Sequence, residues 1–209
     1  LSIKLLKPNY QDEIIVPSIT FVATVNSIIY NSCNPIFIDC DNKFLIDTKK
    51  VLKFLKEKTV TKNGKCFNKK TKKRIIGLIL VHTFGNLVNI NTSLIKECKK
   101  RNIKIIEDSA ESLGSFYIDR LGKKHSGTIG DLGCLSFNGN KIITTGGGGA
   151  IVFKNLQLFK KANYLAAQAK DDSTYFIHND VGYNFKISNL HSAIGIAQFS
   201  KLKSILKKK

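Results

Sequence analysis

The sequence predicts an α/β protein with a mainly parallel central sheet and flanking helices. Short β-branched runs alternate along the chain with amphipathic stretches of roughly ten to fifteen residues, which is typical of βαβ units. The chain has 209 residues, of which 43% are hydrophobic, so it can bury one sizeable core but is too short for two comfortable domains. No internal repeat is visible. We therefore expect a single α/β domain.

Six stretches rich in Ile, Leu and Val have the composition of buried strands. They are Glu13–Val16, Pro35–Asp39, Arg74–Val81, Ile103–Glu107, Leu132–Phe137 and Gly149–Phe153. Helical periodicity predicts five helices, the first with Thr20 as its N-cap. These helices cover Phe21–Tyr30, Thr48–Lys58, Thr92–Arg101, Asn155–Ala169 and Ser188–Leu206. The lysine-rich stretch Lys62–Lys73 is predicted to be a surface loop or a small hairpin, and the chain from Asp108 to Gly130 a loop.

The formal net charge of +19 raises the hypothesis of a nucleic-acid-binding protein. Two features weigh against it. Only Arg74, Arg101 and Arg120 are arginines, the residue type favoured for contacts to bases and phosphates, and the lysines are spread along the chain. We interpret the charge as solvated surface lysines and expect no nucleic-acid partner.

The chain has no apolar run near the ~20 residues that span a bilayer, and it does not begin with a signal peptide, so we expect no membrane contact and a cytoplasmic location. Methionine is absent, and the last ten residues have helical character without a capping Gly or Pro. We therefore expect the chain to be a piece of a longer protein.

The five cysteines are odd in number and widely spaced. Neither a disulfide framework nor a zinc site fits this spacing, and buried or bystander thiols in a reducing compartment fit better. We expect no metal site.

Ligands of parallel sheets bind at the carboxyl ends of the strands, and this rule selects four places in the chain. They are residues 17–21, His82–Gly85, Asp108 and Ser136–Lys141. A carboxylate such as Asp108 at a strand end can anchor a cationic ring nitrogen or a metal, or it can simply bind the start of the next turn. The position of Asp108 alone favours the last of these roles, in which it only binds the next turn.

Lys141 lies between two predicted strands, with apolar and small neighbours and the glycine run Gly146–Gly149 shortly after it. A lysine in such surroundings loses hydration and becomes a better nucleophile. An ordinary surface lysine is the alternative, and composition and spacing do not decide between them. The glycine run does not match a phosphate-binding loop and predicts a tight turn where the backbone passes close to a ligand.

Five motifs occur in order along nearly the whole chain. They are V-P-S-I-T-F-V-A-T-V-N, V-H-T-F-G-N, I-I-E-D-S-A-E-S-L-G-S-F-Y, G-D-L-G-C-L-S-F-N-G-N-K-I-I-T-T-G-G-G-G and G-Y-N-F-K-I-S-N-L-H-S-A-I-G. In this combination the chain resembles the DegT/DnrJ/EryC1/StrS family of sugar aminotransferases, which have the fold type I architecture of aspartate aminotransferase. The resemblance implies a pyridoxal-phosphate-dependent transaminase.

The resemblance also implies residue roles. Lys141 would form the Schiff base with pyridoxal phosphate and then act as the acid/base, while Asp108 would pair with the pyridinium nitrogen. Ser136 would bind the cofactor phosphate, and Glu111 would lie near the ring's 3-hydroxyl. Phe21 would stack on the ring. Asn184 would reach the phosphate in a partner subunit's site, which implies a homodimer.

Two departures from the family pattern concern the cofactor site. Lys186 stands where many relatives have arginine, and lysine cannot make the bidentate contact. The serine-glycine-threonine turn that binds the phosphate in the family would precede Leu1, and the C-terminal small domain would follow Lys209. The resemblance therefore implies a partial cofactor-binding large domain over residues 1–209.

Within the family, the chain is most similar to a branch associated with legionaminic-acid-type and bacillosamine-type sugars. This branch implies transfer of an amino group, usually from glutamate, to the C4 ketone of a nucleotide-linked 4-keto-6-deoxy sugar. The alternatives are a relative with other chemistry, such as a 3-dehydratase, or an inactive binding or regulatory protein on the same fold. A dehydratase has histidine at the position of Lys141, and a degenerate copy is expected to lose Asp108 or Lys141 first.

Overall fold

The computed structural model describes residues 1–119, 122–172 and 174–208, and within them the chain forms one large sheet and one small hairpin. The strands are β1 (Glu13–Pro17), β2 (Asn34–Ile38), β3 (Thr59–Lys62), β4 (Lys65–Asn68), β5 (Arg74–Val81), β6 (Lys104–Asp108), β7 (Phe116–Asp119), β8 (Gly122–His125), β9 (Leu132–Ser136) and β10 (Gly149–Phe153). The six predicted strands are thus confirmed, and no strand end differs from its predicted position by more than one residue.

The large sheet is mainly parallel, as predicted. Its strand order is β10-β9-β6-β5-β1-β2, and the β3–β4 hairpin joins it where β4 pairs with the start of β5. The contacts of β1 with β2 and β5, and of β6 with β5 and β9, are parallel, whereas β10 runs antiparallel to β9. The parallel pairs bring the carboxyl ends of β1, β5, β6 and β9 to one edge of the sheet.

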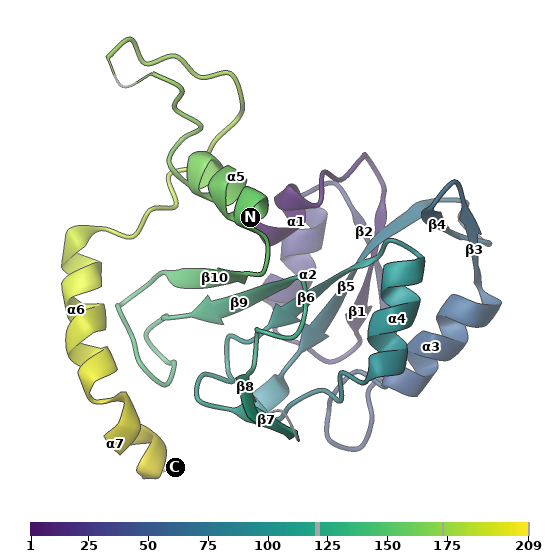
Figure 1. Ribbon diagram of the computed structural model, residues 1–209, viewed down its shortest axis with the longest axis horizontal. Helices are drawn as coiled ribbons and strands as arrows, with labels where there is room; N and C mark the ends of the chain where they lie inside the picture. Colours follow the sequence, from purple (N-terminus) through teal and green to yellow (C-terminus); the bar gives the residue numbers. More distant parts are fainter. Residues whose placement is uncertain (120–121, 173, 209) are drawn as a thin grey trace.

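Helices cover both faces of this sheet (Figure 1). The helices of the described residues are α1 (Ser2–Leu5), α2 (Val22–Ile29), α3 (Thr48–Glu57), α4 (Thr92–Lys100), α5 (Leu156–Ala166), α6 (Asn189–Ser200) and α7 (Leu202–Lys207), with the short turn η1 (Thr83–Gly85) after β5. The helices α3 and α4 pack on one face, whereas α1, α2 and α5 pack on the other. The last two, α6 and α7, lie beyond the β10 edge (yellow in Figure 1).

The alternation of side chains along β5 builds both cores at once. Leu78 and Leu80 enter the core under α3 and α4, while Ile79 and Val81 enter the core under α1 and α2. Successive side chains of a strand point to opposite faces, so a strand covered on both faces must be apolar throughout. This explains why Arg74–Val81 is a continuous apolar run after its first residue.

Several predicted boundaries were wrong. Helix α2, the first of the predicted helices, has Phe21 and not Thr20 as its N-cap. The Thr20 hydroxyl donates a hydrogen bond to Thr24 Oγ1 instead (3.0 Å). The predicted loop between Asp108 and Gly130 contains the β7–β8 hairpin. The last helix is interrupted at Lys201, and the helix before it ends at Ala166.

The cysteines are free thiols, as the spacing predicted, and three of them (Cys33, Cys66 and Cys98) are buried. Among the described residues, no helix combines the length and the apolar character needed to cross a membrane.

A fully buried hydrogen bond between two side chains joins the ends of β5 and β6. The side chains of Glu107 and His82 are 0% exposed, and 2.9 Å separates Glu107 Oε2 from His82 Nε2. Because His82 Nδ1 accepts a hydrogen bond from Val88 N (3.3 Å), the ring proton lies on Nε2. His82 Nε2 therefore donates a hydrogen bond to the carboxylate. Backbone amides of Gly127, Ile129 and Gly130 also donate to Glu107, at 2.6–3.0 Å.

Burial alone would raise the pKa of Glu107, but the hydrogen bonds from His82, Gly130 and Gly127 outweigh it and lower the pKa below its ordinary value. A carboxylate with a lowered pKa stabilises the fold at neutral pH. That stabilisation is lost as the pH falls below about 4.3, where the unfolded chain takes up the proton.

We predict that Glu107→Gln lowers the free energy of unfolding at pH 7 by about 3–5 kcal/mol, because the amide nitrogen would face N–H donors and the buried charge would be lost. Glu97→Gln is the control, since Glu97 forms a partly exposed pair with Arg101 within α4. Glu97→Gln should lower the free energy of unfolding by less than about 1 kcal/mol. Denaturant unfolding measures both. A loss in Glu107→Gln no larger than in the control would contradict the anchoring role.

Candidate functional site

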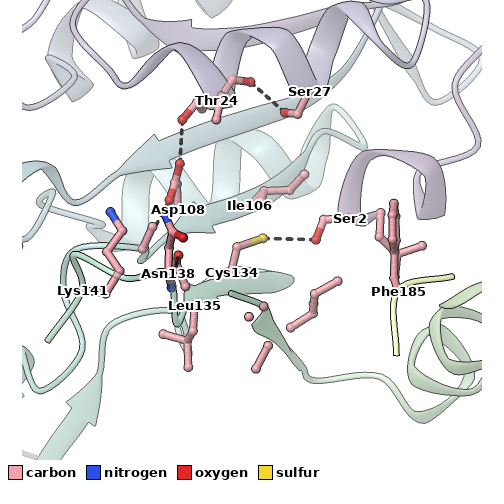
Figure 2. Close-up of a pocket in the computed structure, with 18 of the residues that line it drawn as sticks. Ser2, Thr24, Ser27, Ile106, Asp108, Cys134, Leu135, Asn138, Lys141 and Phe185 are labelled. Carbon is pink, nitrogen blue, oxygen red and sulfur yellow. Dashed lines mark hydrogen bonds between the residues drawn. The ribbon is translucent and has the colours of Figure 1, made fainter. Parts of the chain in front are cut away.

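A cavity of about 1400 Å³ opens at the carboxyl ends of the parallel strands. All six residues predicted for the site line it, although they come from distant parts of the chain. They are Phe21, Asp108, Glu111, Ser136, Lys141 and Asn184. Figure 2 shows Asp108 and Lys141 on its wall, beside the end of α2 that carries Thr24.

Asp108 is the last residue of β6, and both of its carboxylate oxygens accept hydrogen bonds. Thr24 Oγ1 donates to Oδ2 at 2.7 Å, and the amide of Ala110 donates to Oδ1 at 3.2 Å. The second bond is the structural role that a carboxylate after a strand can have, binding the start of the next turn. The first crosses from α2 and holds the carboxylate at the cavity wall, so the two interpretations of Asp108 are compatible.

Lys141 lies in the loop between β9 and β10, and its side chain is only 16% exposed. Its Nζ is 3.7 Å from Glu111 Oε1, while Glu111 Oε2 accepts a hydrogen bond from the amide of Phe84 in η1 (2.8 Å). The amide of Lys141 donates to Asn138 O (3.0 Å), which closes a turn. Lys141 is therefore a tethered cation inside the cavity and not a free surface lysine.

The loop around Lys141 is folded against the glycine run. Thr145 N and the Thr144 hydroxyl both donate to Phe137 O, at 2.9 and 3.1 Å. Gly148 has a φ of +98°, a conformation that side chains with a Cβ rarely adopt, and it lines the cavity. The backbone bends at Gly146 and Gly147, and Gly147, Gly148 and Gly149 line the cavity.

Ser136 ends β9, one strand over from Asp108. Its Oγ accepts a hydrogen bond from Asn138 N (3.4 Å) and has no acceptor for its own proton in the described part of the chain. Thr83 also lines the cavity, and its hydroxyl is buried without a partner among the described residues. The cavity wall therefore offers hydroxyl donors whose hydrogen bonds the protein itself leaves open.

Phe21 and Asn184 lie at the rim. Phe21 is 73% exposed although it is aromatic, so it is available for a ring in the cavity. Asn184 lies in the long segment between α5 and α6 and forms an isolated β-bridge with Ala167. It is exposed in this chain and does not join Asp108, Ser136 and Lys141 on the inner wall.

Thr24 and Cys134 also line the cavity, and neither was predicted from the sequence. The Cys134 thiol contacts Ser2 Oγ (3.2 Å), and burial raises its pKa to about 11. The thiol is therefore protonated at neutral pH and a poor nucleophile. Thr24 is an interior helix residue, and its contact with Asp108 has no signal in the local sequence.

Comparison with known proteins places these features in a family. The model of the DegT/DnrJ/EryC1/StrS aminotransferase family matches residues 1–209. The chain is 34% identical over its whole length to EpsN of Bacillus subtilis, provisionally named a pyridoxal phosphate-dependent aminotransferase, and covers 50% of it. It is 33% identical to the GDP-perosamine synthase of Escherichia coli O157:H7, with 95% of this chain and 49% of the relative covered.

Solved structures with a similar fold agree with the family match. The structure of Helicobacter pylori PseC, an aminotransferase involved in the biosynthesis of pseudoaminic acid, superposes with a TM-score of 0.77 at 26% identity, covering 96% of this chain and 51% of PseC. The chain spans about half the length of the curated relatives it matches. On this evidence, the chain belongs to the DegT/DnrJ/EryC1/StrS aminotransferase family.

Proposed function

We propose that the chain is the cofactor-binding large domain of a pyridoxal-phosphate-dependent sugar aminotransferase. The observation that carries the proposal is the cavity that Asp108, Ser136 and Lys141 share. A C-terminal small domain would follow residue 209, which the length of the relatives supports. The enzyme would transfer an amino group to a nucleotide-linked sugar.

The wall of the cavity fits the chemistry of pyridoxal phosphate. A cationic ring nitrogen needs an anion, which Asp108 supplies, and an aldehyde needs an amine, which Lys141 supplies. The Ser136 hydroxyl has an open donor for a phosphate oxygen, and Phe21 offers an exposed aromatic face at the rim. Glu111, 3.7 Å from Lys141, would lie near the ring hydroxyl.

Bound pyridoxal phosphate would supply an electron sink for the carbon that loses a proton during transamination. The protein would move that proton. Lys141 Nζ would hold the cofactor aldehyde, and its amine would serve as the base and acid that moves the proton. The contact with Glu111 keeps the amine within the cavity when it is free. Asp108 would accept a hydrogen bond from the protonated ring nitrogen.

The relatives support the substrate class that we propose. A GDP-perosamine synthase and an aminotransferase of pseudoaminic acid biosynthesis both point to amino sugars. We propose the C4 ketone of a nucleotide-linked 4-keto-6-deoxy sugar as acceptor, with glutamate as the donor. We also propose that the chain belongs to the branch associated with legionaminic-acid-type and bacillosamine-type sugars.

A homodimer is part of this proposal, with Asn184 reaching the phosphate in the partner's site. The helix α6 supports it, because none of its residues is buried. Leu190 is 80% exposed and Ile196 75% exposed, so a large apolar surface remains for another chain or for the small domain.

We predict that borohydride treatment of the intact gene product with pyridoxal phosphate leaves a phosphopyridoxyl group on Lys141, identified by peptide mass spectrometry. Lys141→Ala should abolish the label and the activity. Lys186→Ala is the matched control, since Lys186 lines the same cavity, and it should keep the label on Lys141. A label that persists in Lys141→Ala would remove this lysine from the proposed role.

We also predict that Asp108→Asn lowers turnover by several orders of magnitude, because a neutral amide does not hold the proton on the ring nitrogen. The exposed Asp39, which pairs with Lys50 at 2.9 Å, supplies the control Asp39→Asn, with turnover close to that of the unchanged protein. Turnover is measured with glutamate and a panel of nucleotide 4-keto sugars. Near-normal turnover of Asp108→Asn would contradict the role of Asp108.

A further inference from the structure

A chain of two threonine hydroxyls leads from the rim of the cavity to Asp108. Thr20 Oγ1 donates to Thr24 Oγ1 at 3.0 Å, and Thr24 Oγ1 donates to Asp108 Oδ2 at 2.7 Å. Figure 2 shows the second of these bonds, running from α2 to the end of β6. Thr24 is 7% exposed, so water does not compete freely for its hydroxyl.

The carboxylate of Asp108 fixes the direction of both hydrogen bonds. A carboxylate only accepts hydrogen bonds, so the Thr24 proton must point to Asp108. The lone pairs of Thr24 Oγ1 are then free to accept the proton of Thr20. Both hydroxyls are therefore committed, and the bond that reaches Asp108 is one between a neutral donor and a charged acceptor, which is among the stronger kinds.

The backbone holds Thr24 in place independently of Asp108. Thr24 lies in the first turn of α2, where its amide donates to Phe21 O (3.0 Å) and its carbonyl accepts from the Ser27 hydroxyl (2.7 Å). The same turn carries Phe21 at the rim of the cavity. The bond from Thr24 therefore couples the orientation of the Asp108 carboxylate to a rigid helix end, while the Ala110 amide holds the other oxygen.

We propose that Thr24 is a positioning residue for Asp108, oriented in turn by Thr20, and that it acts on the cofactor only through that carboxylate. This inference rests on the proposed function, in which Asp108 is the partner of the ring nitrogen. Two donors on two different oxygens fix the plane of the carboxylate and leave lone pairs directed into the cavity. Without Thr24, only the Ala110 amide would hold Asp108, and the carboxylate could rotate away from the ring.

The first test is the affinity of the intact apo-protein for pyridoxal phosphate, followed by absorbance. Thr24→Val replaces the hydroxyl by a methyl group of nearly the same size, and we expect the dissociation constant to rise about 10- to 100-fold. Thr24→Ser keeps the hydroxyl and should bind within a few-fold of the unchanged protein. Thr24→Val that binds as tightly as the unchanged protein would overturn the inference.

The second test is a double-mutant cycle with Asp108→Asn, which separates a positioning role from a packing role. If Thr24 acts through the carboxylate, Thr24→Val should cost much less affinity in the Asp108→Asn background than in the Asp108 background. Equal losses in the two backgrounds would show that Thr24 acts through the packing of α2, and would overturn the inference.

The outcomes also separate this inference from the proposed function. If the unchanged protein binds no cofactor and Lys141 is not labelled by borohydride, the proposed function fails and the role of Thr24 fails with it. If Lys141 is labelled but Thr24→Val binds normally, the proposed function stands and only the role of Thr24 is wrong.

Discussion

The buried carboxylate of Glu107 ties together the segments that form the edge of the sheet at the cavity. It accepts hydrogen bonds from His82 at the end of β5 and from three amides of the loop that precedes β9. That loop packs so closely that a Cβ on Gly133 of β9 would overlap the carbonyl of Gly127. Strands β5, β6 and β9 therefore keep a fixed relation at the edge where their carboxyl ends meet.

The alternation of side chains along β6 then places two adjacent acids on opposite faces of the sheet. Glu107 and Asp108 are neighbours in β6, and their side chains point to opposite faces. Glu107 is fully buried and fastens the strand ends, while Asp108 reaches the cavity and accepts the bond from Thr24. A charge held at the cavity wall needs a support that does not move with the ligand, and the pair of adjacent acids provides both functions.

Much of this was predictable from the sequence, because strands and their ends follow from the hydrophobic pattern. The carboxyl-end rule selected Asp108 and the segment Ser136–Lys141, and only the family resemblance then selected Lys141 from among the lysines. The contact of Thr24 with Asp108 was not predictable, since 84 residues separate them. The donors to Glu107 are backbone amides, which carry no signal in the residue types. Threonine is favoured at N-caps, yet the Thr20 hydroxyl donates its hydrogen bond to the Thr24 side chain.

We propose that Asp108 and Lys141 hold one cofactor in this cavity. A crystal structure of the intact protein grown with pyridoxal phosphate tests it most directly. We predict electron density continuous with Lys141 Nζ, and the ring nitrogen within hydrogen-bond distance of Asp108. A cofactor bound elsewhere, or one in this cavity whose ring nitrogen faces away from Asp108, would contradict the account.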